Sequence, residues 1–182
     1  MKRIYLTILS LIFSLNFLSA QQNPQRATPI NTATINNLYK VNEGVYRSAQ
    51  PGAAACKEFE DMGIKEIINL RHCCNDKKEA SETDLILHHV KMLASNCKWK
   101  KVVEALCIIK DREGPVVIHC KHGADRTGLV VALYRIVFQG WDKEAAIDEL
   151  ENGGFDFHAI YSNIPAYIRK IDVLELKKAV LE

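Results

Sequence analysis

A cysteine and an arginine stand six positions apart in a segment whose composition suits phosphate chemistry. The segment reads His-Cys-Lys-His-Gly-Ala-Asp-Arg-Thr-Gly from His119 to Gly128, with Cys120 near its start and Arg126 near its end. A thiolate is a strong nucleophile, and the planar guanidinium of arginine can hold two phosphoryl oxygens at once. The pair therefore predicts phosphoryl transfer through a covalent phosphocysteine.

The stretches on either side of this segment must position the pair. Residues 116–118 form a short run of β-branched side chains, which is typical of a central strand buried on both faces. Residues 127–139 have helical spacing with an almost wholly apolar surface, which predicts a central buried helix. Gly123 permits a sharp turn between them. Backbone N–H groups of such a loop, with the helix dipole, form an anion site that also favours the thiolate of Cys120.

The rest of the chain alternates between strand and helix patterns, which predicts an α/β fold with one sheet packed by helices. Its 182 residues and 48% hydrophobic content suit one domain. The expected strands are 44–47, 64–70 and 85–90. The expected helices are 51–62, 99–109, 143–151 and 165–181, with Asp142 capping the third of these.

The segment from His119 to Gly128 matches the signature of the protein tyrosine and dual-specificity phosphatase superfamily. Residues 44–51 and 68–71 also resemble the opening elements of its compact bacterial and atypical dual-specificity members. The resemblance spans Leu38 to the C-terminus. It implies a single-domain cysteine-phosphatase fold, with a central, mostly parallel sheet flanked by helices.

The resemblance also implies roles for individual residues. Cys120 is the expected nucleophile, Arg126 the clamp on the transition state, and Thr127 the hydroxyl that helps the thiolate to leave. His119 is expected to tune the environment of the cysteine. The expected phosphate cradle consists of Lys121, His122, Gly123, Ala124 and Asp125. Arg47 and Arg71 follow predicted strands, where each either contacts phosphate, braces the cradle or is a surface arginine without a role.

The general acid departs from the family pattern. Members usually supply an aspartate from the loop that here is 91–98, which contains no carboxylate. Asp125 is the first candidate, since myotubularins and Sac-type phosphoinositide phosphatases resemble this chain in carrying Asp at that loop position. Alternatively, Asp125 pairs with a loop N–H or a neighbouring base. Asp84 is a weaker candidate because it precedes its strand.

The expected substrates are phosphotyrosine or phosphoserine/threonine proteins, or polyanionic inositol phosphates, which Lys121, His122 and Asp125 in the loop would allow. His122 either senses substrate charge or is simply exposed. Two other functions stay open: a rhodanese-like sulfurtransferase and a non-catalytic phosphate-binding module. Near-equal numbers of basic and acidic residues, 24 and 22, argue against nucleic-acid binding. No cofactor is implied, and the His72-Cys73-Cys74 cluster lacks the second spaced pair of a zinc site.

The N-terminus reads as a secretory signal. Lys2 and Arg3 precede an apolar run over 4–18, and small residues lead to a cleavage position after Ala20. The run is shorter than a membrane span, so no stable span is expected after cleavage. We therefore predict a signal peptide over 1–20, a flexible leader over 21–37 and a phosphatase domain over 38–182, located in the periplasm or outside the cell. The sequence leaves disulfide pairing and oligomeric state open.

Overall fold

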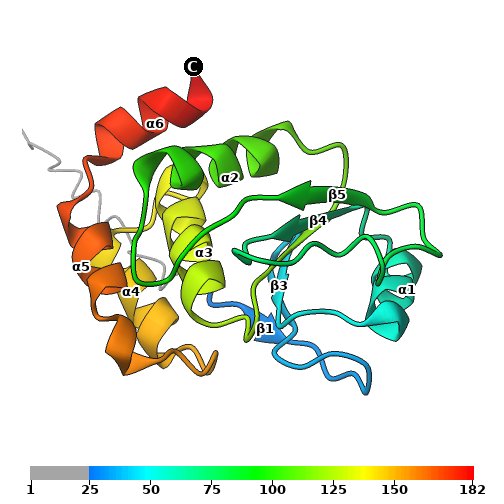
Figure 1. Cartoon of the computed structure of the whole chain (residues 1–182). Helices are drawn as coiled ribbons and strands as arrows, with labels where there is room; N and C mark the ends of the chain where they lie inside the picture. Colours follow the sequence, from blue (N-terminus) through cyan, green and yellow to red (C-terminus); the bar gives the residue numbers. More distant parts are fainter. Residues whose placement is uncertain (1–24) are drawn as a thin grey trace, which may run out of the picture.

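A computed structural model describes residues 25–182, which form one mixed sheet with helices on both faces (Figure 1). The predicted signal peptide over 1–20 lies outside the described residues. Within the described part of the chain, no helix is both long enough and apolar enough to cross a membrane. The predicted fold class, an α/β fold with a mostly parallel central sheet, is confirmed.

The sheet has the strand order β1-β2-β3-β6-β4-β5. Neighbours from β3 to β5 pair in parallel, whereas β1, β2 and β3 pair antiparallel at the other edge. All four residues of β4 and of β6 are buried, as predicted for strands covered on both faces. The strands are β1 (Thr28–Pro29), β2 (Tyr39–Asn42), β3 (Val45–Ser48), β4 (Glu66–Asn69), β5 (Ile86–His89) and β6 (Val116–His119).

The helices divide unequally between the two faces. α1 contributes to a small apolar cluster with Ile35, Leu38 and Val117, whereas the larger core contains residues of all the other helices. α3 lies at the centre of that larger layer and is buried along almost its whole length, as its apolar surface predicts. The helices are α1 (Ala53–Asp61), α2 (Trp99–Asp111), α3 (Asp125–Phe138), α4 (Lys143–Asn152), α5 (Asn163–Lys170) and α6 (Val173–Leu181), with a 3₁₀ turn at Ala159–Tyr161.

Two expectations need correction. The leader predicted over 21–37 is not separate from the domain over residues 25–37, because β1 pairs with β2 and Ile35 is only 7% exposed. Because the composition of this segment is mostly polar, the sequence did not predict its one buried apolar side chain, Ile35, or its short edge strand, β1. The helix predicted over 165–181 is two helices, α5 and α6. Ile171 has an extended backbone, and the Asp172 side chain accepts hydrogen bonds from Leu174 N and Glu175 N to start α6.

Candidate active site

The register of the central strands brings three loops together at the carboxyl ends of β3, β4 and β6. Ser48 at the end of β3 and Asn69 at the end of β4 both pair with His119 at the end of β6. Parallel strands therefore end at the same level, where ligands bind in open α/β sheets. Cys120 follows directly after β6 with its side chain almost fully buried, and α3 begins at Asp125. Asp84 precedes β5, so it lies toward the amino-terminal ends of the parallel strands, away from Cys120, as the sequence predicted.

The loop between β6 and α3 is held by hydrogen bonds that residues outside it donate to its carbonyl groups. The carbonyl of Lys121 accepts a hydrogen bond from the N–H of Gln50 at 3.3 Å. The carbonyl of His122 accepts one from the Asn37 side-chain amide at 2.8 Å, and that of Gly123 one from the Arg47 guanidinium at 2.7 Å. In a trans peptide the C=O and the following N–H point in opposite directions. Three successive outward carbonyls therefore turn the next N–H groups inward, which is how a backbone anion site forms.

Gly123 makes the tight turn of this loop possible. Its φ is +74°, a left-handed conformation in which a side chain is strained. A Cβ placed there would lie 2.5 Å from the carbonyl oxygen of Ser48 and 2.7 Å from the nitrogen of Ala49. Both contacts are with backbone atoms at the end of β3 and directly after it, which cannot rotate away. The loop therefore lies directly against this segment, and only glycine fits.

Replacing Gly123 with alanine is expected to reduce kcat/KM by about 100-fold, because a displacement near 1 Å misplaces the reacting groups. Gly140→Ala is the matched control, since Gly140 has φ +71° but no atom within 4 Å of its Cβ position. Both variants should lose about 1–3 kcal/mol of stability from strain. Steady-state kinetics and thermal unfolding separate the two effects. Equal loss of activity in both variants would show that contact with Ser48 is irrelevant.

Arg47 braces the loop from beneath. Its side chain is 1% exposed, its guanidinium carbon lies 3.5 Å from the centre of the Phe155 ring, and it donates to Gly123 as described above. Burial lowers the pKa of Arg47 to about 10, partly offset by the charges of Glu149 and Cys120, so the group stays cationic at neutral pH. The structure therefore gives Arg47 the bracing contact that was one of the roles expected for it, and contact with a bound phosphate stays a prediction.

Arg126 and Thr127 start α3 with polar atoms that have no partner among the described residues. The Nε of Arg126 and the Oγ1 of Thr127 are both buried without a hydrogen bond. Leaving a buried donor unpaired costs about 1–3 kcal/mol, so two of them on consecutive residues indicate a place built for another group. Phosphoryl oxygens suit the guanidinium, and a sulfur anion suits the hydroxyl. The roles of Arg126 as clamp and of Thr127 as donor to the leaving thiolate stay predictions.

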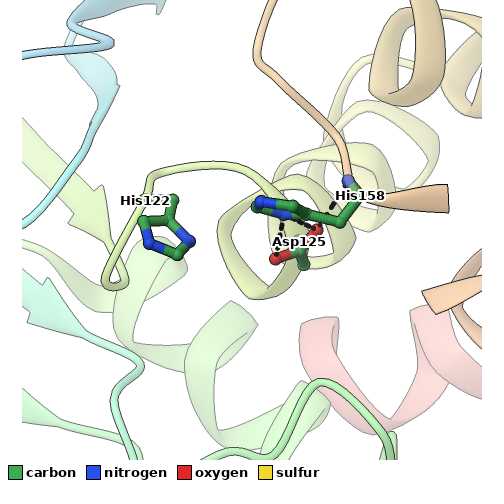
Figure 2. A group of neighbouring side chains, drawn as sticks. All are labelled: His122, Asp125 and His158. Carbon is green, nitrogen blue, oxygen red and sulfur yellow. Dashed lines mark hydrogen bonds and ion pairs between the residues drawn. The ribbon is translucent and has the colours of Figure 1, made fainter. Parts of the chain in front are cut away.

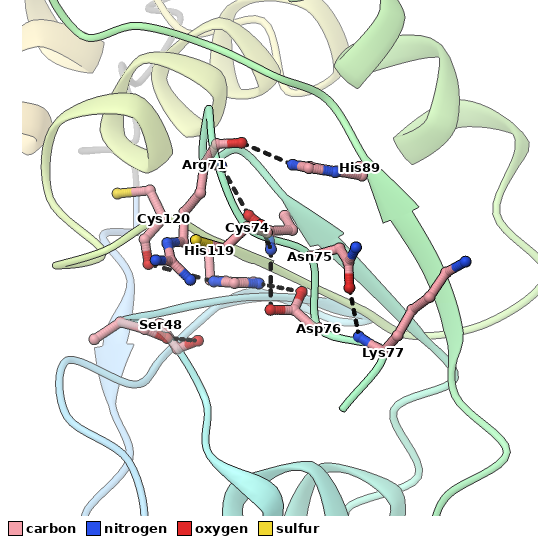
Figure 3. A network of polar contacts seen from close by, with 11 residues as sticks. Ser48, Arg71, Cys74, Asn75, Asp76, Lys77, His89, His119 and Cys120 are labelled. Carbon is pink, nitrogen blue, oxygen red and sulfur yellow. Dashed lines mark hydrogen bonds and ion pairs between the residues drawn. The ribbon is translucent and has the colours of Figure 1, made fainter. Parts of the chain in front are cut away.

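Arg71 lies next to the cysteine pair at the loop after β4. The pKa of the exposed Cys73 thiol is lowered, chiefly by a hydrogen bond with Cys74 and further by the positive charges of Arg71 and Arg126. Both arginines thus place positive charge near the Cys73 thiol. The backbone carbonyl of Arg71 is held by His89 at 2.8 Å (Figure 3). The position is compatible with contact to a bound phosphate ester.

His119 belongs to a buried network that sequence reasoning missed (Figure 3). Its Nε2 lies 2.9 Å from the Asp76 carboxylate, and its Nδ1 lies 3.3 Å from the carbonyl oxygen of Cys120. The Asn69 amide donates to the other oxygen of Asp76 at 2.9 Å. Asp76 falls in the stretch 71–83, whose charged and irregular composition is typical of a surface loop, yet it is buried. The available signal was that a histidine on a buried strand needs a polar partner.

Asp125 pairs with a residue from a distant part of the chain (Figure 2). Its carboxylate is almost fully buried and accepts a hydrogen bond from the backbone N–H of His158 at 3.0 Å. The Nδ1 of His158 also lies 3.0 Å from both carboxylate oxygens. His158 lies in the loop after α4, about 30 positions beyond the motif, and nothing in the local sequence marks it. Asp125 thus has the neighbouring base that one reading of the sequence expected.

A solvent-filled hollow lies beside the loop. Lys121 and His122 are exposed and line this hollow, whereas Ala124 is fully buried and does not. The His122 ring lies 5.1 Å from the His158 ring, centre to centre. The hollow is lined by Asn36, Asn37, Tyr39, Ala49, Lys121, His122, Gly154, Asp156 and His158.

The fold and the loop together define a cysteine-dependent phosphatase. Residues 33–179 match the model of the tyrosine phosphatase family, and the chain belongs to that family. This match begins within the predicted leader.

Several known proteins are similar to the chain. The dual-specificity protein phosphatase TpbA of Pseudomonas aeruginosa is 34% identical over 169 residues, which cover 89% of this chain and 74% of TpbA. A crystal structure of a TpbA variant in complex with phosphotyrosine superimposes with a TM-score of 0.78 at 32% identity, covering 88% of this chain and 99% of that one. The inositol diphosphatase DSP2 of rice, Oryza sativa subsp. japonica, is 32% identical over 127 residues, covering 64% of this chain and 61% of DSP2.

Proposed function

We propose that Cys120 attacks the phosphorus of a phosphate monoester while Arg126 and the loop N–H groups hold the phosphoryl oxygens. The Sγ–P bond forms as the bond to the leaving oxygen breaks, and that oxygen takes a proton. Water then attacks the phosphocysteine, which releases inorganic phosphate and restores the thiolate, stabilised by the Thr127 hydroxyl. The outward carbonyls of Lys121, His122 and Gly123 are the observation that carries this proposal.

The leading substrate is a phosphotyrosyl group on a protein. TpbA, which is similar to this chain over most of its length, has a crystal structure in complex with phosphotyrosine. A phosphotyrosyl leaving group also needs less protonation than an alkyl one, which suits a site without an aspartate over 91–98.

An inositol diphosphate is the second candidate. The exposed Lys121, His122 and His158 lie on one side of the loop, and Lys91 and Lys98 line a second hollow with His72. A compact polyanion would gain from these basic side chains more than a phosphopeptide with one dianionic group. The similar DSP2 is an inositol diphosphatase.

Initial rates of phosphate release distinguish these functions. The assay compares a phosphotyrosyl peptide, a phosphoseryl peptide and an inositol diphosphate at equal concentrations. We expect the phosphotyrosyl peptide to have the highest kcat/KM, and faster cleavage of the inositol diphosphate would favour the second candidate. Sulfur transfer from thiosulfate without phosphate release would indicate a rhodanese-like enzyme. Tight binding of phosphate with no turnover of any substrate would indicate a binding module.

The Asp125–His158 pair is proposed to deliver the proton to the leaving oxygen. The backbone N–H and the Nδ1 of His158 both face this carboxylate at 3.0 Å, so a proton can pass between the imidazole and Asp125. His158 is 44% exposed, which lets the pair exchange that proton with solvent.

The Asp125→Asn variant is expected to lose about 100- to 1,000-fold in kcat with an alkyl phosphate but little with nitrophenyl phosphate, whose leaving group needs no proton. The measurement is kcat across a series of phosphate esters of rising leaving-group basicity. Asp156→Asn is the control, since Asp156 is an exposed carboxylate of the same hollow. An equal loss for all leaving groups would assign Asp125 a structural role instead.

Export is part of the proposal and rests on residues 1–20. The basic start, the apolar run and the small residues before the expected cleavage after Ala20 support it. Mass spectrometry of the protein from fractionated bacterial cells tests it. A chain that begins at Gln21 outside the cytoplasm is the expected result, and an intact chain confined to the cytoplasm would contradict it.

A further inference from the structure

Three side chains at the mouth of the phosphate loop converge on one small space (Figure 2). They are His122 from the loop, Asp125 from the first turn of α3, and His158 from the segment after α4. One imidazole nitrogen or carboxylate oxygen from each lies within 4.8 Å of the other two. His122 and Asp125 belong to one segment, whereas His158 comes from a segment 33 positions beyond Asp125, so the convergence depends on the fold and does not follow from one local motif.

We propose that these three residues bind one divalent transition-metal ion of the class of Zn²⁺. Two imidazoles and a carboxylate are a donor set that suits zinc and its neighbours, whereas magnesium and calcium prefer oxygen ligands alone. Three protein ligands leave at least one coordination position open to water or to an oxygen of a phosphate ester.

The separations of the donor atoms fit such an ion after small side-chain movements. Tetrahedral zinc with bonds of about 2.1 Å places neighbouring ligand atoms roughly 3.4 Å apart. The Nδ1 of His158 is 3.0 Å from Asp125, and no chosen pair exceeds 4.8 Å. The His122 ring is exposed and can close the remaining gap by rotation. The ion would take the place of the hydrogen bond between the Nδ1 of His158 and the Asp125 carboxylate.

Asp125 gives the site one rigidly held ligand. Its carboxylate is buried, and the backbone N–H of His158 donates to one oxygen, as ligating carboxylates usually require from their surroundings. The hollow beside the loop is open to solvent and contains both histidines, which gives an ion a path to the site. Asp125 thus anchors the ion, and the two exposed histidines complete the coordination.

An ion at this site would inhibit the phosphatase selectively. It would occupy the pair that we propose as proton donor, without contact to Cys120. This consequence rests on the proposed function, whereas the binding itself does not. Inhibition should be strong for an alkyl phosphate and weak for nitrophenyl phosphate. An ion bound by the Cys120 thiolate would block both substrates equally.

Binding is measured first, with metal alone and no substrate. Calorimetric titration of the chain with Zn²⁺ should show one site that weakens at least about tenfold in His122→Ala and in His158→Ala. Both side chains are exposed, so their removal should leave the thermal unfolding temperature almost unchanged. Titration with Co²⁺ should give an absorption spectrum without a cobalt–thiolate charge-transfer band.

The control is His88→Ala. His88 also pairs with a carboxylate, that of Glu66 at 2.8 Å, but lies outside the three-residue cluster, so its loss should leave Zn²⁺ binding unchanged. Unchanged affinity in both His122→Ala and His158→Ala would overturn the proposal, as would a thiolate band that disappears in Cys73→Ser or Cys74→Ser. Confirmed binding with equal inhibition of both substrates would keep the metal site and reject the pair as proton donor.

Discussion

Replacing Cys120 with serine is expected to reduce kcat on the order of 10⁴-fold or more, because serine is not ionised in a site built to stabilise a thiolate. The cradle itself should persist, since its outward carbonyls are held by Gln50, Asn37 and Arg47 and not by the cysteine. Turnover is measured by phosphate release, and retention of the site by calorimetric titration with inorganic phosphate. We expect phosphate affinity within a few-fold of the wild-type value.

A second cysteine serves as the control for this variant. Cys107 lies half-buried on α2, so Cys107→Ser should keep full turnover. Rapid acid quenching of the wild-type enzyme should also trap phosphate on a peptide that contains Cys120. Appreciable turnover by Cys120→Ser, or label trapped on another residue, would exclude the phosphocysteine mechanism.

The sequence predicted most of the central elements because their signals are local. Residues 116–118 are β-branched, and the structure has β6 there with every residue buried. The apolar surface of residues 127–139 predicted the buried α3. The tight loop between these two elements is enough to bring Cys120 and Arg126 into one site. In each case a short window of residues determines both the element and its environment.

The supporting contacts could not be predicted because they join distant segments. Asn37 holds the loop carbonyl of His122 across 85 positions, yet its polar surroundings indicated a flexible leader. Asp76 meets His119 across 43 positions from an irregular loop. His158 meets Asp125 across 33 positions. Single polar residues carry no periodicity, so only the folded chain shows which of them are buried partners and which are solvated.

Replacing Arg126 with lysine is expected to lower kcat by about 100- to 1,000-fold, which corresponds to about 2.7–4 kcal/mol of transition-state stabilisation. Lysine keeps the positive charge but is a point donor, whereas the guanidinium can hold two oxygens of the transferring phosphoryl group. The buried Nε of Arg126 has no partner within residues 25–182, so this donor is also available to the phosphoryl group. The measurement is kcat and KM for nitrophenyl phosphate.

The split between the two kinetic constants tests the role. If Arg126 acts mainly in the transition state, kcat falls while KM changes little; a rise in KM alone would make it a ground-state anchor. Arg169→Lys is the control, because Arg169 is an exposed partner of Glu144 far along the chain and should leave both constants unchanged. Full kcat in Arg126→Lys would mean that charge alone suffices and that bidentate geometry is not used. The loop N–H groups would then carry the stabilisation of the transferring phosphoryl group, and Gly123→Ala would become the more damaging change.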